Sequence, residues 1–220
     1  MRVRFATISS LVLSLVAVAT AGQTAPVYGG ATPQEVVASL QKAVKSNDFL
    51  GAVPFISPDG RKELANEGVT GVIMVLAFSD PDDPIPGGKP LAKAELDAKR
   101  KSYRAAMDLA KATLKPHGLD AFIGKPAMSA ETQGAIDAAI SKADTVALVT
   151  SLMGAMVQMG PMLRMSKKGE GPKLPFTLGN VTDYKITGDK ATAKNGAEAI
   201  DFVRVGGRWF MTPPKQGGSK

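Results

Sequence analysis

The chain has 220 residues but no cysteine, a single histidine and a single tryptophan. Without cysteine there can be no disulfide bond, thiolate metal site, cysteine nucleophile or lipid-anchored N-terminal cysteine. The lone histidine, His117, directly follows Pro116 and has no cluster of acidic residues near it in the sequence. Such a context is more typical of a helix end than of a base or a metal ligand. The sequence therefore predicts no catalytic residue and no cofactor.

Acidic residues are fewer than basic ones: 20 Asp and Glu stand against 27 Lys and Arg, which gives a net charge of +7. A basic balance can indicate a nucleic acid, an anionic membrane or an anionic polymer as partner. This excess is modest, however, and is typical of a solvated cationic surface. Together with the export predicted from the N-terminus, it argues against a nucleic-acid partner.

Long apolar runs are confined to the N-terminus. Residues 1–21 combine a basic start, Arg2 and Arg4, with an apolar run and a small-x-small cleavage site. This pattern predicts a signal peptide cleaved near Ala21, and loss of its two arginines lowers the charge from +7 to +5. The next longest apolar run, Val69–Phe78, has about half the ~20 residues that a membrane span needs. We therefore expect an exported protein, periplasmic or secreted, with no transmembrane span in the mature chain.

Capping residues mark the first helix. Residues 22–31 are aperiodic and contain Gly and Pro, so they are expected to be a flexible mature N-terminus. Thr32 is a candidate cap, and Glu35 completes a capping box ahead of an amphipathic run that ends near Asn47.

Two further helices are predicted before the middle of the chain. Residues 48–56 form a short one, and Ser57 followed by Pro58 starts the next. The apolar run 69–78 fits a buried helix or a buried strand by its pattern alone. Its continuity with the capped start favours a helix.

The stretch 79–175 is predicted to be a helical insertion. It begins with a loop rich in Asp and Pro at 79–90, which lacks the ligand spacing and the bidentate Glu of an EF-hand calcium site. Three helices and a linker rich in Lys, Gly and Pro follow, with expected bounds 91–115, 129–142, 144–159 and 167–175. The first of these helices carries a basic cluster that we interpret as a solvated face, with anion binding as the alternative: Lys99, Arg100, Lys101 and Arg104.

The C-terminal run 179–214 is divided into four short segments, rich in β-branched and aromatic residues, by three turn pairs: Gly188-Asp189, Asn195-Gly196 and Gly206-Gly207. Each pair supplies a residue that tolerates positive φ, which a two-residue hairpin turn requires. This pattern predicts an antiparallel meander of four strands on which the upstream helices pack. Within 197–205 the apolar residues change from even to odd positions, which predicts a bulge or a strand covered on both faces.

Methionine recurs at every third position before the linker: Met153, Met156, Met159, Met162 and Met165. A step of three turns a helix by about 300°, so the first three side chains share one face. Gly160-Pro161 is expected to break or kink the helix and to redirect the last two. Core packing explains the series, while an adaptable apolar groove and a thioether site for Cu(I) are the alternatives.

Parts of this pattern resemble small secreted domains of the nuclear-transport-factor-two-like superfamily. The resemblance rests on Gly188–Ala193, on Phe202–Phe210 with the closing Pro213-Pro214, and on the opening helix that begins at Thr32. It implies helices packed on a strongly curved antiparallel sheet that forms a cone with an apolar pocket. Two features depart from the superfamily. The helical insertion is far longer than its usual connection, and the Asp, His or Tyr base of its enzymatic members has no counterpart here.

A pocket between the methionine face and the sheet would be lined by seven candidate residues: Met153, Met156, Met159, Tyr184, Asp201, Arg204 and Trp209. Four of them have a structural role available as well. Tyr184 and Trp209 could be core residues, and Asp201 could form a cross-strand pair with Arg204 or Lys185.

The sequence therefore predicts an α+β fold, with N-terminal and central helices packed on a C-terminal curved antiparallel four-stranded sheet. A single domain is expected at 32–214, followed by a flexible tail at 215–220. The expected function is noncatalytic binding of a small apolar ligand or of an envelope protein. Two alternatives remain: a pocket enzyme of isomerase or dehydratase type that uses Asp201 or His117, and copper binding through the methionines.

Overall fold

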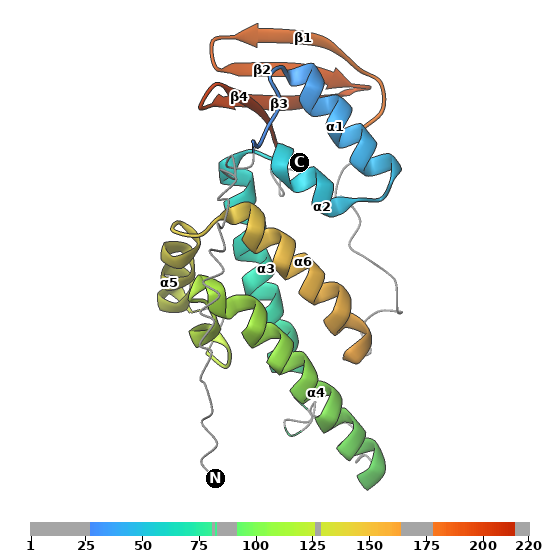
Figure 1. Cartoon of the computed structure of the whole chain (residues 1–220), viewed down its shortest axis with the longest axis vertical. Helices are drawn as coiled ribbons and strands as arrows, with labels where there is room; N and C mark the ends of the chain where they lie inside the picture. The colour runs from blue at the N-terminus through green and yellow to red at the C-terminus, as the bar shows by residue number, and fades with distance from the viewer. Residues whose placement is uncertain (1–26, 81, 83–91, 126–128, 164–177, 214–220) are drawn as a thin grey trace, which may run out of the picture.

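The computed structural model of the chain describes residues 27–80, 82, 92–125, 129–163 and 178–213. The molecule is elongated, with a four-stranded sheet and the first helix at one end and a body of helices at the other (Figure 1). This arrangement confirms the predicted α+β class with a C-terminal antiparallel sheet. The predicted signal peptide, most of the loop at 79–90, and the linker at 167–175 lie outside the described residues.

The first helix, α1 (Pro33–Lys45), begins at the predicted cap. The Thr32 hydroxyl accepts a hydrogen bond from the Glu35 backbone N–H at 3.2 Å, while the Glu35 carboxylate accepts one from the Ala31 N–H at 2.8 Å. These bonds satisfy N–H groups that the first turn of a helix leaves without an intrahelical partner. The apolar stripe of α1 is buried against the sheet: Val36, Val37, Leu40 and Ala43.

A short helical segment links α1 to the helical body. It consists of α2 (Phe49–Ala52) and the 3₁₀ turn η1 (Val53–Phe55), close to the predicted short helix. Asn47 adopts a left-handed φ of 51°, which ends α1 and redirects the chain.

The apolar run 69–78 is helical. It forms the second half of α3 (Pro58–Ser79), whose start is capped by the Ser57 hydroxyl. Four of its residues are almost fully buried: Val69, Val72, Ile73 and Leu76. The predicted choice of helix over strand is confirmed, because a capped start carries one continuous helix through the run.

Three more helices complete the helical body: α4 (Lys93–Leu114), α5 (Ala130–Ile140) and α6 (Thr145–Met162). Two 3₁₀ turns, η2 (Lys115–His117) and η3 (Asp120–Phe122), follow α4. Ser129 and Asp144 cap α5 and α6, as their side chains accept backbone hydrogen bonds from the first turns.

Of the break or kink expected at Gly160-Pro161, the break is wrong. Helix α6 continues through Pro161 and ends at Met162. Proline removes one backbone donor and crowds the preceding turn, but so close to the helix end this costs few hydrogen bonds.

Four antiparallel strands form the sheet in the order β1-β2-β3-β4: β1 (Val181–Thr187), β2 (Lys190–Asn195), β3 (Glu198–Val205) and β4 (Arg208–Thr212). The first and third turns fall on the predicted pairs. The middle turn is Gly196-Ala197, one residue later than predicted, because Asn195 pairs with both Val181 and Glu198.

The bulge predicted as one alternative for the third strand is absent from β3, and cover on both faces is limited to its centre, since Phe202 is the one buried residue of the strand. Strand β3 pairs with β2 and β4 without a register shift. Phe202 is buried on the α1 side, and on the other side Val203 stands opposite the buried Phe210. The sheet's register shift lies in β1 instead, between Thr182 and Lys185, where Asp183 has a φ of 55°.

Two hydrophobic cores fill the interior. One lies between α1 and one face of the sheet, and the other lies among α3, α4, α5 and α6. The α2–η1 segment contributes to both, because Phe49 and Val53 belong to the helical core and Ala52 to the sheet core. Thus α1 covers the sheet directly, whereas the central helices connect to it through η1 and the start of α3.

The outer edge of β4 is covered by two short isolated bridges. Gly30 exchanges two backbone hydrogen bonds with Trp209, at 2.9 and 2.8 Å, and Ile56 lies parallel to Met211. Gly29 beside the first bridge has a φ of 76°, and a Cβ there would come within 2.6 Å of the Trp209 carbonyl oxygen. Glycine is therefore required where the N-terminal segment enters the sheet.

Candidate functional site

Five of the seven candidate pocket residues are divided between the two cores, and the other two are exposed. The methionines lie on α6 in the helical body, while Tyr184 and Trp209 pack in the sheet core. Asp201 and Arg204 are exposed on β3. The structure thus brings the methionines together on α6 and the other four candidates together on the sheet. It does not bring the methionines and the sheet residues to one cavity.

The methionine series contributes chiefly to the helical core. Met159 is 2% exposed, and Met153 and Met156 are half-buried against the same core. Met162 is 37% exposed at the helix end, and Met165 lies outside the described residues. The first three side chains point into or along the core, so helix packing accounts for their spacing.

The two aromatic candidates are core residues of the sheet end. The Trp209 side chain is 5% exposed, and the ring of Tyr184 lies 6.4 Å from that of Phe202, centroid to centroid. Burial raises the pKa of the Tyr184 hydroxyl.

The charged candidates have no specific partner. Among the described residues, neither Asp201 nor Arg204 forms an ion pair, so the cross-strand pair expected for Asp201 is absent. The ion pair in this part of the sheet joins Lys194 to Asp183, at 3.0 Å. Asp201 borders an open hollow with Asp59 and Glu63 from the first turns of α3.

His117 is half-buried at the end of η2. Neither it nor any other described residue belongs to a group of three His, Asp or Glu that could hold a metal ion. The part of the chain that the structure describes therefore offers no conventional metal centre.

An apolar hollow lies between α2 and α6, with a volume of about 400 Å³. We call it the α2–α6 groove. Its apolar walls are Phe49 and Leu50 from α2 and Met153 and Val157 from α6, and its floor includes Gly154. Gly154 leaves the groove open, because a Cβ at this position would meet no other atom within 4 Å.

Polar groups at the groove are few and mostly engaged. The Asp48 carboxylate accepts a hydrogen bond from the Gly51 N–H at 2.8 Å and so caps α2. The Gln158 amide donates to the Gly154 carbonyl at 3.4 Å. The apolar residues open to an incoming group are Leu50, 40% exposed, and the half-buried Met153 and Val157, and the exposed polar side chains beside them are Asn47, Asp48 and Gln158. This chemistry suits a neutral apolar group.

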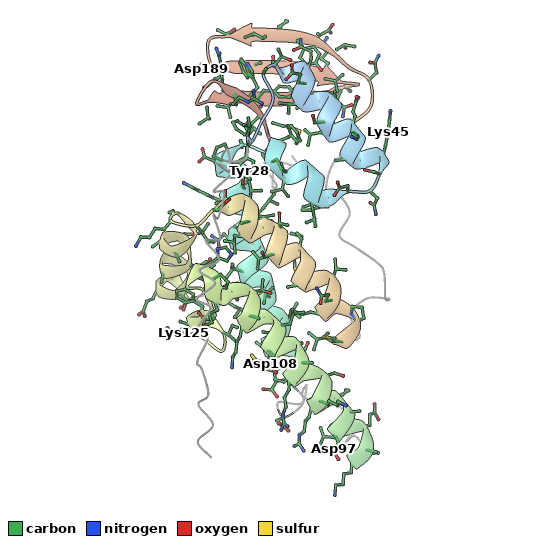
Figure 2. All side chains as sticks on the ribbon, in the orientation of Figure 1. Tyr28, Lys45, Asp97, Asp108, Lys125 and Asp189 are labelled. Atoms are coloured by element: carbon green, nitrogen blue, oxygen red, sulfur yellow. The ribbon has the colours of Figure 1, made fainter. Side chains whose placement is uncertain are left out.

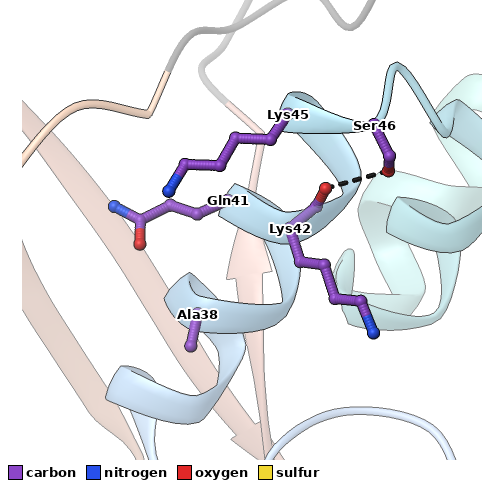
Figure 3. A pocket seen from close by; sticks show the side chains of 5 residues that line it. All are labelled: Ala38, Gln41, Lys42, Lys45 and Ser46. Atoms are coloured by element: carbon purple, nitrogen blue, oxygen red, sulfur yellow. Dashed lines mark hydrogen bonds between the residues drawn. The ribbon is translucent and has the colours of Figure 1, made fainter.

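A second hollow, of about 470 Å³, lies on the outer face of α1 near its C-terminal end (Figure 3). The Ser46 hydroxyl donates to the Lys42 carbonyl at 2.9 Å, and the Gln41 amide donates to the Gly179 carbonyl at 2.6 Å. The side chains of Lys42 and Lys45 extend in different directions (Figure 3), so they do not converge on a common ligand.

The junction between the two ends of the molecule is built around a buried arginine. Arg61 is 6% exposed, and its guanidinium lies between the rings of Tyr28 and Phe210, with its carbon 5.5 and 5.4 Å from their centroids. It donates hydrogen bonds to the Ile56 carbonyl at 2.7 Å and to the Thr145 hydroxyl at 3.3 Å. Figure 2 shows Tyr28 between the sheet and the helical body.

Burial determines the electrostatics of this junction. It lowers the pKa of the Arg61 guanidinium and raises the pKa of the Tyr28 hydroxyl, to which the nearby Asp144 carboxylate also contributes. The Tyr28 hydroxyl donates to that carboxylate at 3.4 Å. These shifts have a structural cause, because both groups are packed between elements rather than aimed into a cavity.

Helix α6 is, among the described residues, the one helix long and apolar enough to cross a membrane. A core helix passes the same test, and one side of α6 is buried against α3 and α4. The finding is therefore weak evidence for a membrane span.

Comparison of the chain with known protein families, curated proteins and solved structures gives no match. The resemblance to the nuclear-transport-factor-two-like superfamily accordingly stays a prediction.

Sequence reasoning missed Leu50 and Val157 of the groove and Arg61 of the junction. Leu50 follows a helix cap in a very short helix, where no periodicity can be read. Arg61 lies among charged residues in the first turn of α3, a pattern that indicates solvent exposure. The Asn47-Asp48 pair, a helix end followed by a new cap, was the available signal that the chain turns at this point.

Proposed function

We propose that the chain is an exported, noncatalytic binding module that takes a small apolar group into the α2–α6 groove. The observation that carries the proposal is the apolar part of the groove lining, Leu50, Met153 and Val157 around an open Gly154, whose one charged neighbour, Asp48, is engaged as the cap of α2. Its volume of about 400 Å³ falls within the range of small-molecule sites. The same walls suit a free apolar ligand or an apolar side chain of an envelope protein.

A noncatalytic role is favoured by where the displaced pKa values fall. In active sites, titratable groups with shifted pKa values are gathered in a cavity. Here the pKa of each tyrosine is raised chiefly by burial, and that of Arg100 is raised by its hydrogen bond to Asp82 at the surface. None of these groups lines the α2–α6 groove.

The proposal is tested by filling the groove. Gly154→Phe adds a ring to the groove at a position where a Cβ would meet no other atom within 4 Å. We expect it to weaken binding of the uncharged fluorescent dye phenylnaphthylamine at least tenfold, because the dye and the ring compete for one volume. Leu50→Glu should have a similar effect, since a charge at this exposed wall disfavours an apolar guest.

The matched control is Gly71→Phe, at another glycine in a helix where a Cβ would meet no atom within 4 Å. It should leave dye binding unchanged. Equal dye affinity in Gly154→Phe and Gly71→Phe, with unchanged helical circular dichroism, would reject the groove as the binding site. Export is tested separately by the intact mass of the protein recovered outside the cytoplasm, which should correspond to cleavage after Ala21.

A further inference from the structure

Two exposed apolar side chains lie at one end of the helical body. Phe78 at the end of α3 is 76% exposed, and Met162 at the end of α6 is 37% exposed. The two helices run parallel with a constant offset of 84 residues. Arg61 bonds to Thr145 at this offset, and Gly68 lies against Leu152 at the same one (152 − 68 = 84). The same offset relates the ends of the two helices, where Phe78 and Met162 are found (162 − 78 = 84).

Basic side chains border this apolar end. Asp82, four residues after Phe78, binds Arg100 of α4 through the Nε atom at 2.9 Å. This ion pair holds the end of α3 against the first half of α4. Lys101 and Arg104 are exposed on that part of α4, which projects beyond α3 and α6 (Figure 1). With Arg100 and Asp97 they line a hollow of about 430 Å³.

The outward side of α4 keeps a positive balance. Within an arc of about 100° on the helix, two acidic residues, Asp97 and Asp108, stand among five basic ones: Lys93, Arg100, Lys101, Arg104 and Lys111. The ion pair with Asp82 neutralises Arg100, so five positive and three negative charges leave +2. Asp80, which accepts a hydrogen bond from the Asp82 backbone N–H at 2.9 Å, adds a fourth negative charge at the end of α3 and lowers the balance to +1.

We propose that this end of the molecule, hereafter the basic tip (Phe78, Met162, Lys101 and Arg104), docks on a bilayer surface that contains anionic phospholipid. Lysine and arginine are attracted to anionic headgroups, and an exposed aromatic ring beside them partitions into the interface. The part of α4 that carries Lys101 and Arg104 projects beyond α3 and α6, so a flat surface can reach these side chains (Figure 1). The inference is independent of the α2–α6 groove, whose lining contains no residue of the basic tip.

Sedimentation with lipid vesicles tests the proposal. The exported protein is mixed with vesicles of phosphatidylcholine alone and with vesicles of equal parts phosphatidylcholine and phosphatidylglycerol. We expect binding only to the second kind, and weaker binding as salt is raised, because salt screens exposed charges. Phe78→Ser should weaken binding about tenfold, since it removes one buried aromatic side chain from the interface. Lys101→Gln with Arg104→Gln should weaken it about twentyfold, since two attracted charges are lost.

Matched controls lie on the sheet, at the opposite end of the molecule (Figure 1). Ile186 on β1 is 55% exposed, so Ile186→Ser removes an exposed apolar side chain as Phe78→Ser does. Lys185→Gln with Lys190→Gln removes two exposed charges from β1 and β2. Both should bind vesicles as the unmodified protein does. All replaced residues are exposed, and circular dichroism verifies that each variant is folded.

Two outcomes would overturn the proposal. One is a lack of specificity, seen either as equal binding to both kinds of vesicle or as a loss of binding in the sheet variants that equals the loss in the variants of the basic tip. The other is binding to a soluble polyanion such as heparin that needs Lys101 and Arg104, with vesicle binding that is unaffected by Phe78→Ser. That result would identify a polyanion rather than a bilayer as the partner.

Discussion

The guanidinium carbon of Arg61 lies 5.4 Å from the ring centroid of Phe210, which places a buried charge from α3 directly on a residue of β4. The same guanidinium also lies over the ring of Tyr28, at 5.5 Å from its centroid, and donates to the Ile56 carbonyl. A cation between two aromatic faces gains electrostatic stabilisation that offsets part of the cost of its desolvation. Arg61 therefore joins the helical body, the sheet and the N-terminal segment.

Removal of this side chain should destabilise the whole molecule. Arg61→Ala leaves the Ile56 carbonyl without its side-chain donor and opens a gap between two rings, so we expect the free energy of unfolding to fall by about 3 kcal/mol. Arg61→Lys keeps the charge but loses the planar guanidinium, and about 1–2 kcal/mol should be lost. Urea unfolding followed by the fluorescence of Trp209, the single tryptophan, and by circular dichroism measures both.

The neighbouring exposed Lys62 provides the control, and Lys62→Ala should change stability by no more than about 0.5 kcal/mol. If Arg61→Ala were as stable as Lys62→Ala, the junction would contribute nothing to the fold.

Two glycines of α3 should respond in opposite ways to the same substitution. A Cβ at Gly68 would lie 3.1 Å from the Leu152 Cδ1 atom of α6, whereas one at Gly71 would meet nothing within 4 Å. Gly68→Leu should therefore force α3 and α6 apart and cost about 1–3 kcal/mol. Gly71→Leu should stabilise the protein by up to ~0.8 kcal/mol through helix propensity. Thermal unfolding of the two variants measures the difference in their stability. Equal melting temperatures would contradict the close contact of α3 with α6.

Folding stability should decline above pH 10. The pKa values of Tyr28, Tyr103 and Tyr184 are all raised from 10.0, in each case chiefly by burial. Just above this pH the tyrosines of the unfolded chain lose their protons while those of the folded chain keep them. Since the folded state then binds more protons, stability is full below pH 10 and falls as pH rises through the folded-state pKa values.

Urea midpoints measured on both sides of pH 10 test this dependence. Tyr184→Phe should make the decline shallower, because it removes one of the three groups responsible. A flat profile across this range would mean that the tyrosines are as solvated in the folded chain as in the unfolded one.

Local sequence signals predicted most elements correctly. Three helices of the structure begin at side-chain caps: α1 at Thr32, with Glu35 completing the capping box, α3 at Ser57 and α6 at Asp144. The glycine turns around Gly188 and Gly206 likewise separate strands, since positive φ is required there. These signals act over a few residues, which is why they can be read from the chain alone.

The division into two cores could not be predicted in the same way. An apolar pattern indicates that Met159 and Trp209 are buried, but not that they are buried in different places. The α2–α6 groove depends on the direction in which Asn47 turns the chain, and the burial of Arg61 depends on aromatic residues far away in sequence. Both are consequences of tertiary packing.

The central claim is that the α2–α6 groove receives an apolar group, and the methionine methyl groups report on it most directly. NMR of isotope-labelled methyl groups is recorded while phenylnaphthylamine is added. Met153 lines the groove, whereas Met74 on α3 and Met211 on β4 do not. We predict that the Met153 signal shifts with dye concentration while those of Met74 and Met211 stay in place. An unchanged Met153 signal with dye bound, or equal shifts at all three methionines, would contradict the account.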